Sequence, residues 1–285
     1  MIIVLGFDGL GLELIEEFKL KAIKQKAYTE TDLSDFKTHP FTPIIWASML
    51  TGRKIDEMEK IYMNYQIDTS GFIFSVAKKL LPVNIRKRLR VMYSRMVWKW
   101  RGIEKNPMQA LQGWLKDNNV KTIFDEFKEN NISYWHNNIP GYNGVPHHNE
   151  NMEIVKKALS GHKEYYDKYR RLVWQQHIER KRTFFNALSK GYEAYFFYTN
   201  LVDALGHLFY HSTMERMKMA FEVDKIVSHV RDKFPDARIY VVSDHGMEIR
   251  NGIPDHSDKG FFSSNTGELI RKPMELYDLL HRVME

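Results

Sequence analysis

The stretch Ser243-Asp244-His245-Gly246-Met247 holds the two most informative side chains of this sequence, Asp244 and His245. It follows the apolar run Arg238-Ile239-Tyr240-Val241-Val242, which predicts a buried strand. An Asp-His pair at the carboxyl end of a strand lies in the crevice where open α/β sheets bind their ligands. Carboxylate oxygen together with imidazole nitrogen suits zinc or manganese, so we interpret the pair as metal ligands. An ordinary turn is the alternative.

Two other predicted strands end in a similar way. Residues 2–7 form an apolar run followed by Asp8, and residues 192–200 form a second run followed by Asp203 and His207. Asp203 and His207 are four residues apart, so on a helical turn they share one face, as metal ligands would. A capping Asp with an unrelated His is the alternative. The pattern predicts an α/β fold with a central, mostly parallel sheet flanked by helices.

Thr42 begins a predicted helix that ends at Gly52. Pro43 favours the first helical turn, which places Thr42 at the N-cap. A hydroxyl at a helix N-terminus also meets free N–H groups and the positive end of the helix dipole, where a phosphate docks and an alkoxide is favoured. Thr42 is therefore a candidate nucleophile as well as a cap. His256 lies in the polar segment 254–260, which we predict to be a loop.

Composition excludes several kinds of site. The 285 residues suffice for one large α/β domain, which we predict to span 1–285. The absence of cysteine excludes disulfides, thiolate zinc sites and a cysteine nucleophile. A dinucleotide site in the turn after residue 7 is disfavoured because Asp8 would repel a pyrophosphate.

The apolar run 1–5 is short and lacks the preceding basic residues of a signal peptide, so we expect a soluble, cytoplasmic protein.

The positive charge is concentrated in one region. Ten basic residues and only Glu104 lie between Lys78 and Lys105; without them, the 42 basic and 36 acidic residues of the chain become 32 and 35. No nucleic-acid-binding module is evident, because the rest of the chain carries no basic excess. We predict that residues 53–120 form a helical cap or insertion. An apolar stripe at helical spacing runs through it: Ile85, Leu89, Met92, Met96 and Trp100.

This basic region has two interpretations. A basic amphipathic helix can lie on an anionic membrane surface or hold an acidic ligand. Alternatively, it is a solvated helix that packs one side on the core or on another subunit.

Further along the chain, residues 150–188 are charged and mostly helical, and we place Arg180 to Arg182 on a solvated face.

The candidate residues are similar, in their order and in their positions after strands or in loops, to those of the alkaline phosphatase superfamily. In particular, the chain resembles the type I phosphodiesterase/nucleotide pyrophosphatase branch. Each element is weakly specific alone, but together they span most of the chain. The matching residues are Asp8, Thr42, Asp203 with His207, Asp244 with His245, and His256.

The resemblance implies a metal-dependent phosphoric ester hydrolase, most simply a phosphodiesterase, that forms a phospho-threonine on Thr42. The phosphoryl group would then pass to water or to another alcohol. The cofactors would be two divalent cations, zinc or alternatively manganese, because three carboxylates and three imidazoles neutralise two dications. One cation would be held by Asp8, Asp244, His245 and the Thr42 oxygen, and the other by Asp203, His207 and His256.

The chain departs from the family pattern at one substrate-binding position. Nucleotide pyrophosphatases carry an Asn three residues after the nucleophile, whereas Ile45 stands here. A backbone N–H near Thr42, or a side chain such as Asn64 or Asn138, would have to bind the phosphoryl oxygen instead. Lys259 is a further candidate for substrate binding. Nucleotide specificity is not implied.

Other functions within and outside the superfamily stay open. A phosphomonoesterase or a transferase of a phospho-alcohol group would use the same residues. A sulfatase is disfavoured because Thr42 cannot become a formylglycine, and a cofactor-independent phosphoglycerate mutase uses a Ser and a larger inserted domain. The alternative from another class is a catalytically inactive metal-binding protein with the same fold.

Overall fold

The computed structural model describes residues 1–65, 110–144, 149–250 and 252–284. The basic region Lys78–Lys105 and its apolar stripe lie outside the described residues. The cap predicted for 53–120 is therefore described only at its two ends. Buried side chains at these ends, Ile55, Met58, Leu111 and Leu115, belong to the core of the molecule.

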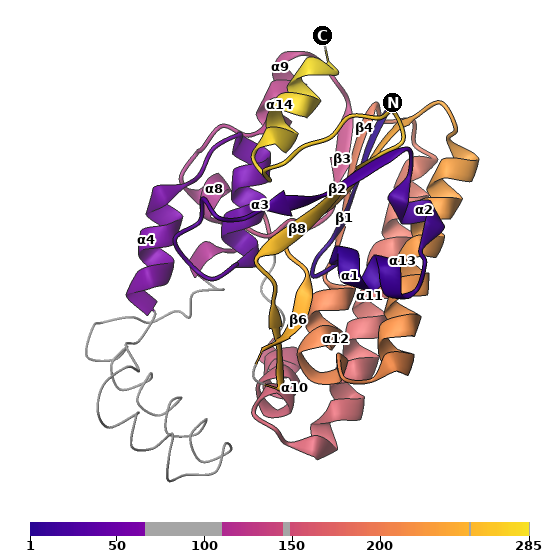
Figure 1. The fold of residues 1–285 in the computed structure, drawn as a ribbon. Coiled ribbons are helices and arrows are strands. Elements are labelled where there is room, and N and C mark those ends of the chain that lie inside the picture. Colours follow the sequence, from indigo (N-terminus) through magenta and orange to yellow (C-terminus); the bar gives the residue numbers. More distant parts are fainter. Residues whose placement is uncertain (66–109, 145–148, 251, 285) are drawn as a thin grey trace.

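The centre of the molecule is a six-stranded sheet in the order β2-β8-β5-β1-β4-β3 (Figure 1). Strands β5, β1, β4 and β3 are parallel to one another, and β8 and β2 add an antiparallel edge. The predicted α/β fold with a mostly parallel sheet is confirmed. The strands are β1 (Ile2–Phe7), β2 (Ala27–Asp32), β3 (Tyr134–His136), β4 (Ala194–Thr199), β5 (Arg238–Ser243) and β8 (Lys259–Ser264).

Helices cover both faces of the sheet because β1 is apolar on both sides. Ile3, Leu5 and Phe7 pack into one core cluster, and Ile2 and Val4 pack into the other. The first cluster is covered by α1 (Leu12–Glu17), α2 (Lys21–Lys24), α10 (Asn149–Leu159), α11 (Tyr166–Leu188), α12 (Leu201–Phe209) and α13 (Thr213–Lys233). The second is covered by α3 (Thr42–Thr51), α4 (Asp56–Tyr65), α8 (Trp114–Asp117), α9 (Ile123–Glu129) and α14 (Glu275–Arg282). A 3₁₀ turn, η1 (Lys163–Tyr165), precedes α11.

The register of the parallel strands brings three strand ends to one edge of the sheet. Phe7 pairs with Thr199, and Gly6 pairs with Val242. The residues that follow β1, β4 and β5 therefore meet in one place. This edge is where ligands bind in open α/β sheets.

The segment around His256 is not the loop that its polar composition predicted. Residues Ile253–His256 form β7, which pairs antiparallel with β6 (Met247–Arg250). This two-stranded sheet continues beyond the end of β5 and lies beside α12 (Figure 1). The prediction failed because backbone pairing in this hairpin compensates for its polar, partly exposed side chains.

Helix α3 begins one residue earlier than predicted, because Thr42 was expected to be the N-cap residue. Phe41 is the N-cap residue, Thr42 is the first helical residue, and no side chain caps the helix. Gly52 ends the helix with a φ of 70°, as a left-handed C-cap requires. The Thr42 hydroxyl is therefore not used as a cap. Over the described residues, no helix has the length and apolar character needed to cross a membrane.

Candidate metal centre

Backbone contacts hold the three strand ends together. The N–H of Asp8 donates to the Thr199 carbonyl at 3.0 Å, and the N–H of Asp203 donates to the Asp8 carbonyl at 3.1 Å. Asp203 and His207 both lie on α12, four residues apart. The β6–β7 hairpin brings His256 to the same place. The structure thus assembles side chains from β1, α12, the end of β5 and β7.

One group of ligand atoms consists of Asp8, Asp244 and His245. Their nearest nitrogen and oxygen atoms all lie within 4.8 Å of one another. His245 Nε2 lies 3.2 Å from Asp8 Oδ1 and 3.4 Å from Asp244 Oδ2. The Thr42 hydroxyl lies 3.4 Å from Asp8 Oδ1 and 3.3 Å from His245 Nε2. A carboxylate pair, an imidazole and a hydroxyl thus converge on one point.

A second group adjoins the first. Its centre is Asp203 Oδ1, which lies 3.1 Å from His256 Nε2, 3.2 Å from His207 Nε2 and 4.0 Å from His245 Nε2. The two nitrogens of His207 and His256 face each other at 3.2 Å. The rings of His245 and His256 are stacked, with centroids 3.8 Å apart. His245 therefore belongs to both groups and joins them into one cluster.

Backbone carbonyls set the tautomers of two of these histidines. His256 Nδ1 lies 2.8 Å from the Pro40 carbonyl oxygen, and His245 Nδ1 lies 3.0 Å from that of Gly246. A carbonyl only accepts, so each Nδ1 carries the hydrogen and, in the neutral ring, Nε2 keeps a lone pair. Both lone pairs then point at carboxylate oxygens. This is the arrangement of metal-ligating histidines, and it needs a cation to be favourable.

Asp244 is the clearest sign that a positive charge belongs here. Its side chain is 0% exposed, and neither carboxylate oxygen has a hydrogen-bond partner among the described residues. Burial, together with the charges of Asp8 and Asp203, raises the pKa of Asp244 well above its ordinary value. A buried carboxylate without donors is costly unless it is protonated or binds a metal. The donor set of oxygen and imidazole nitrogen fits zinc or manganese.

The nearby charges also shift the pKa values of His207 and Asp203. Burial lowers the pKa of His207, but Asp203 outweighs it and raises that pKa to about 9. Burial works against ionisation of Asp203, but His207 and His256 hold the pKa of this carboxyl well below its ordinary value. His207 would exchange its Nε2 proton for a metal ion, so cation binding there would release a proton.

The substrate-binding candidates lie on three other segments of the chain. Asn64 is exposed on α4, and Asn138 is exposed in the loop after β3. Lys259 pairs with Glu30 at 3.0 Å across β8 and β2, and its side chain is largely exposed. The backbone carbonyl of Lys259 accepts from the N–H of Gly246, the residue after His245, at 2.8 Å. Their proposed role stays a prediction.

Two residues beside the cluster were missed by sequence reasoning. Tyr198, within the apolar strand β4, donates its hydroxyl to Asp8 Oδ2 at 2.5 Å. The burial of Tyr198 raises the pKa of its phenol well above the ordinary value, so the group stays a donor. His39 stacks on His256 and bonds Asp255 at 2.9 Å. A tyrosine near the carboxyl end of a buried strand, whose hydroxyl needs a partner, is the signal that could have found Tyr198.

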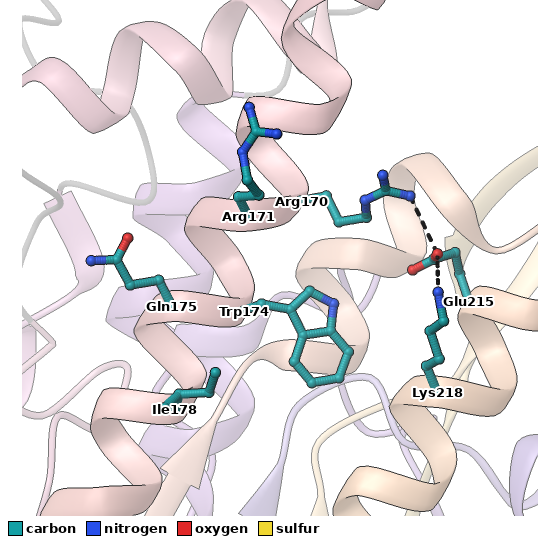
Figure 2. A pocket seen from close by; sticks show the side chains of 7 residues that line it. All are labelled: Arg170, Arg171, Trp174, Gln175, Ile178, Glu215 and Lys218. Atoms are coloured by element: carbon teal, nitrogen blue, oxygen red, sulfur yellow. Dashed lines mark hydrogen bonds and ion pairs between the residues drawn. The ribbon is translucent and has the colours of Figure 1, made fainter.

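Away from this centre, a surface groove of about 540 Å³ lies between α11 and α13 (Figure 2). Figure 2 shows Glu215 at one side of it, held by Arg170 and Lys218. The groove contains none of the predicted ligands. It is lined by Arg170, Arg171, Trp174, Gln175, Ile178, Glu215 and Lys218.

Comparison with known proteins agrees with the residue pattern. The family model "Type I phosphodiesterase / nucleotide pyrophosphatase" matches residues 2–257. Among solved structures, the alkaline phosphatase of the Antarctic bacterium TAB5 is 14% identical over 99% of this chain and 97% of its own, with a TM-score of 0.43. Two mutants of that enzyme with bound Mg give TM-scores of 0.43 and 0.42 at the same identity and coverage. No curated protein matches this chain.

Proposed function

The chain belongs to the type I phosphodiesterase/nucleotide pyrophosphatase family of the alkaline phosphatase superfamily and is a phosphoester hydrolase, and we propose that it cleaves phosphodiesters with Thr42 as the nucleophile. Two divalent cations, zinc or alternatively manganese, would be its cofactors. The observation that carries this proposal is the fully buried Asp244, without donors, in the same cluster as the Thr42 hydroxyl.

The ligand assignment follows the two groups of the cluster. Bound cations would supply positive charge that favours the Thr42 alkoxide and offsets the charge of the phosphoryl oxygens. The residues that would hold them are Asp8, Asp244, His245 and the Thr42 oxygen for one cation, and Asp203, His207 and His256 for the other.

The surroundings of the Thr42 hydroxyl support its role as the nucleophile. Its hydroxyl donates toward Asp8 Oδ1, and a hydroxyl that donates to a carboxylate is polarised toward the alkoxide. The side chain is only 4% exposed, so substrate rather than bulk water would contact the oxygen. Attack forms a bond from Thr42 Oγ1 to phosphorus and breaks one ester bond, whose oxygen takes up a proton and leaves as an alcohol, while the phosphoryl group on Thr42 keeps the other ester. A water or a second alcohol then takes the group from Thr42.

The first turn of α3 would bind the phosphoryl oxygens. The N–H of Thr42 is the candidate donor at the positive end of the dipole, because Pro43 has no N–H and Ile44 and Ile45 donate to the Phe41 carbonyl at 2.9 and 3.3 Å. The side chain three residues after Thr42 does not help, because Ile45 is 1% exposed and packs in the core. This proposal therefore covers phosphodiesters in general and assigns no nucleotide base.

The ester class and the metal are tested in one experiment. The full chain is stripped of metal with a chelator and refilled with zinc or with manganese. Hydrolysis of an aryl phosphodiester is then compared with that of the matching monoester. We expect diester turnover that requires the metal. Preference for the monoester would move the protein to the phosphatases, and two bound metals with no turnover of either ester would contradict the general diesterase activity.

A further inference from the structure

Helix α11 reaches the residues just before α12 with two buried or half-buried side chains. His177 Nδ1 lies 2.9 Å from Thr199 Oγ1, and Arg180 Nη1 donates to Asn200 Oδ1 at 2.6 Å. His177 and Arg180 are three residues apart, so they share one face of the helix. The placement of Arg180 on a solvated face was thus wrong. Thr199 and Asn200 directly precede the helix that carries Asp203.

The bond from Arg180 changes how α12 begins. Asn200 is the N-cap residue, yet its side chain makes no capping bond. An Asn at this position ordinarily accepts from the backbone N–H two or three residues on. Here Oδ1 of Asn200 accepts from Arg180 instead, and the N–H of Asp203, the third helical residue, donates to the Asp8 carbonyl. Because Asn200 Oδ1 bonds Arg180, it does not accept from the Asp203 N–H. That N–H instead bonds the Asp8 carbonyl and joins the start of α12 to the residue after β1.

Tyr198, the residue before Thr199 and Asn200, contacts Asp8 directly. The Tyr198 hydroxyl occupies Asp8 Oδ2, which leaves Oδ1 directed toward Thr42 and His245. The Tyr198 ring is held in turn, since Trp46 meets it edge-on at 5.2 Å and the Arg180 guanidinium lies 5.8 Å from its centroid. The phenol fixes which oxygen of Asp8 is free.

Helix α13 supports the same arrangement from behind. Glu222 accepts from His177 Nε2 at 3.1 Å and also pairs with Lys181. The carboxylate only accepts, so Nε2 of His177 carries a hydrogen and, in the neutral ring, Nδ1 accepts the Thr199 hydroxyl. The contacts thus run without a break from α13 through α11 to the ligand segments.

We propose that His177, Arg180, Tyr198 and Asn200 form a polar brace that positions Asp8 and Asp203 for cation binding. The proposal rests on the metal centre of the proposed function. Groups that orient metal ligands from outside typically change metal affinity by about 10–100-fold when they are mutated. A brace that served only the fold would change stability and leave the affinity of the folded protein unaltered.

The test measures zinc affinity of the full chain by competition with a chromogenic chelator. Tyr198→Phe removes only the hydroxyl that holds Asp8, and Arg180→Met removes the donor that keeps Asn200 Oδ1 from accepting the Asp203 N–H. We expect each variant to bind zinc at least about 10-fold more weakly than the wild type. Two variants serve as matched controls and should bind as the wild type does. Tyr195→Phe removes another buried phenol of β4, which accepts from the Tyr192 N–H, and Arg182→Met removes an exposed cation from α11.

Circular dichroism establishes that each variant is folded before its affinity is compared. Folded Tyr198→Phe and Arg180→Met with wild-type zinc affinity would overturn the brace, whatever their melting temperatures. Because zinc binding needs no substrate, weaker binding by these variants supports the brace even if the wild type hydrolyses no ester. If Tyr198→Phe fails to fold, Arg180→Met, at a half-buried position, decides the result.

Discussion

The Nδ1 atom of His256 donates to the carbonyl oxygen of Pro40 across 2.8 Å. This bond ties β7 to the residues that lead into α3, two positions before Thr42. It also leaves Nε2 of His256 directed at Asp203 Oδ1. One hydrogen bond therefore couples a candidate metal ligand to the segment that carries the candidate nucleophile.

Replacing His256 with Asn tests the ligand role. Asn can keep a donor near the position of Nδ1 but has no atom at the position of Nε2. We expect zinc affinity to fall by at least about 10-fold, since loss of a ligand should cost no less than loss of a group behind it. His211→Asn, an exposed position after α12, is the matched control in the chelator competition. Equal losses in both variants would contradict a ligand role for His256.

Zinc should stabilise the folded chain. A ligand that binds only the folded state at 100 times its Kd adds about 2.7 kcal/mol to the free energy of unfolding. For a chain of this size we expect the melting temperature to rise by roughly 5–10 °C. Scanning calorimetry of the metal-free and zinc-loaded protein checks this, and identical melting curves would contradict it.

Asp244→Asn should separate stability from metal binding. The pKa of Asp244 is raised in the folded protein, so its ionised form opposes folding at neutral pH. Asn carries no charge, and the metal-free variant should melt above the metal-free wild type. The rise on adding zinc should be lost or much reduced, because a ligand is gone. A variant that melts lower than the wild type without metal would show that the Asp244 charge is already compensated by the protein.

The acid stability of the chain should depend on Glu222. Burial opposes its ionisation, but His177 and Lys181 lower its pKa from 4.5 to about 2. A carboxyl whose folded pKa is lowered stabilises the fold above its unfolded pKa, and this contribution disappears as the pH falls through the folded value. Glu222→Gln should therefore destabilise most near pH 6, and the difference from wild type should shrink between about pH 4.5 and 2.

Urea unfolding at several pH values measures this difference. The exposed Glu179 on α11 provides a control, and Glu179→Gln should change the free energy of unfolding little at any pH. A Glu222→Gln difference that is constant from pH 6 to pH 2 would show that the carboxylate charge contributes nothing.

Restoring the family residue at position 45 should not restore a phosphate ligand. Ile45 is buried in the core under α3, so Ile45→Asn places an amide where no water reaches. Loss of the apolar side chain together with burial of the amide should cost about 3 kcal/mol or more. Ile45→Val should cost only about 1 kcal/mol. A stable Ile45→Asn variant with tighter phosphate binding would contradict this placement.

The main parts of the site follow from simple regularities in the sequence. Runs such as 239–242 are apolar throughout because a central parallel strand is buried on both faces, and the carboxyl ends of such strands meet at one edge. Acidic residues and histidines directly after those runs therefore had to lie near one another. The spacing of Asp203 and His207 likewise required only one turn of helix.

The residues that were missed depend on contacts between distant segments. In the sequence, Tyr198 looks like one more core residue of β4. Its partner Asp8 is identified only by the fold, which brings the carboxylate beside the Tyr198 hydroxyl. Arg180 reads as a solvated cation because its partner, Asn200, is close only after α11 packs on the sheet. The strand β7 is recognisable only through its pairing with β6, since its own residues are typical of a loop. No local pattern contains these relationships.

The activity of the Thr42→Ala variant, loaded with zinc, tests the central claim most directly. The measurement is the rate of aryl phosphodiester hydrolysis relative to Thr51→Ala, a variant at the far end of the same helix whose hydroxyl bonds the Ala47 carbonyl. If Thr42 is the nucleophile, Thr42→Ala should lose at least about a thousand-fold in rate while Thr51→Ala keeps most of its activity. Zinc-loaded Thr42→Ala that hydrolyses the diester as fast as Thr51→Ala would contradict the account.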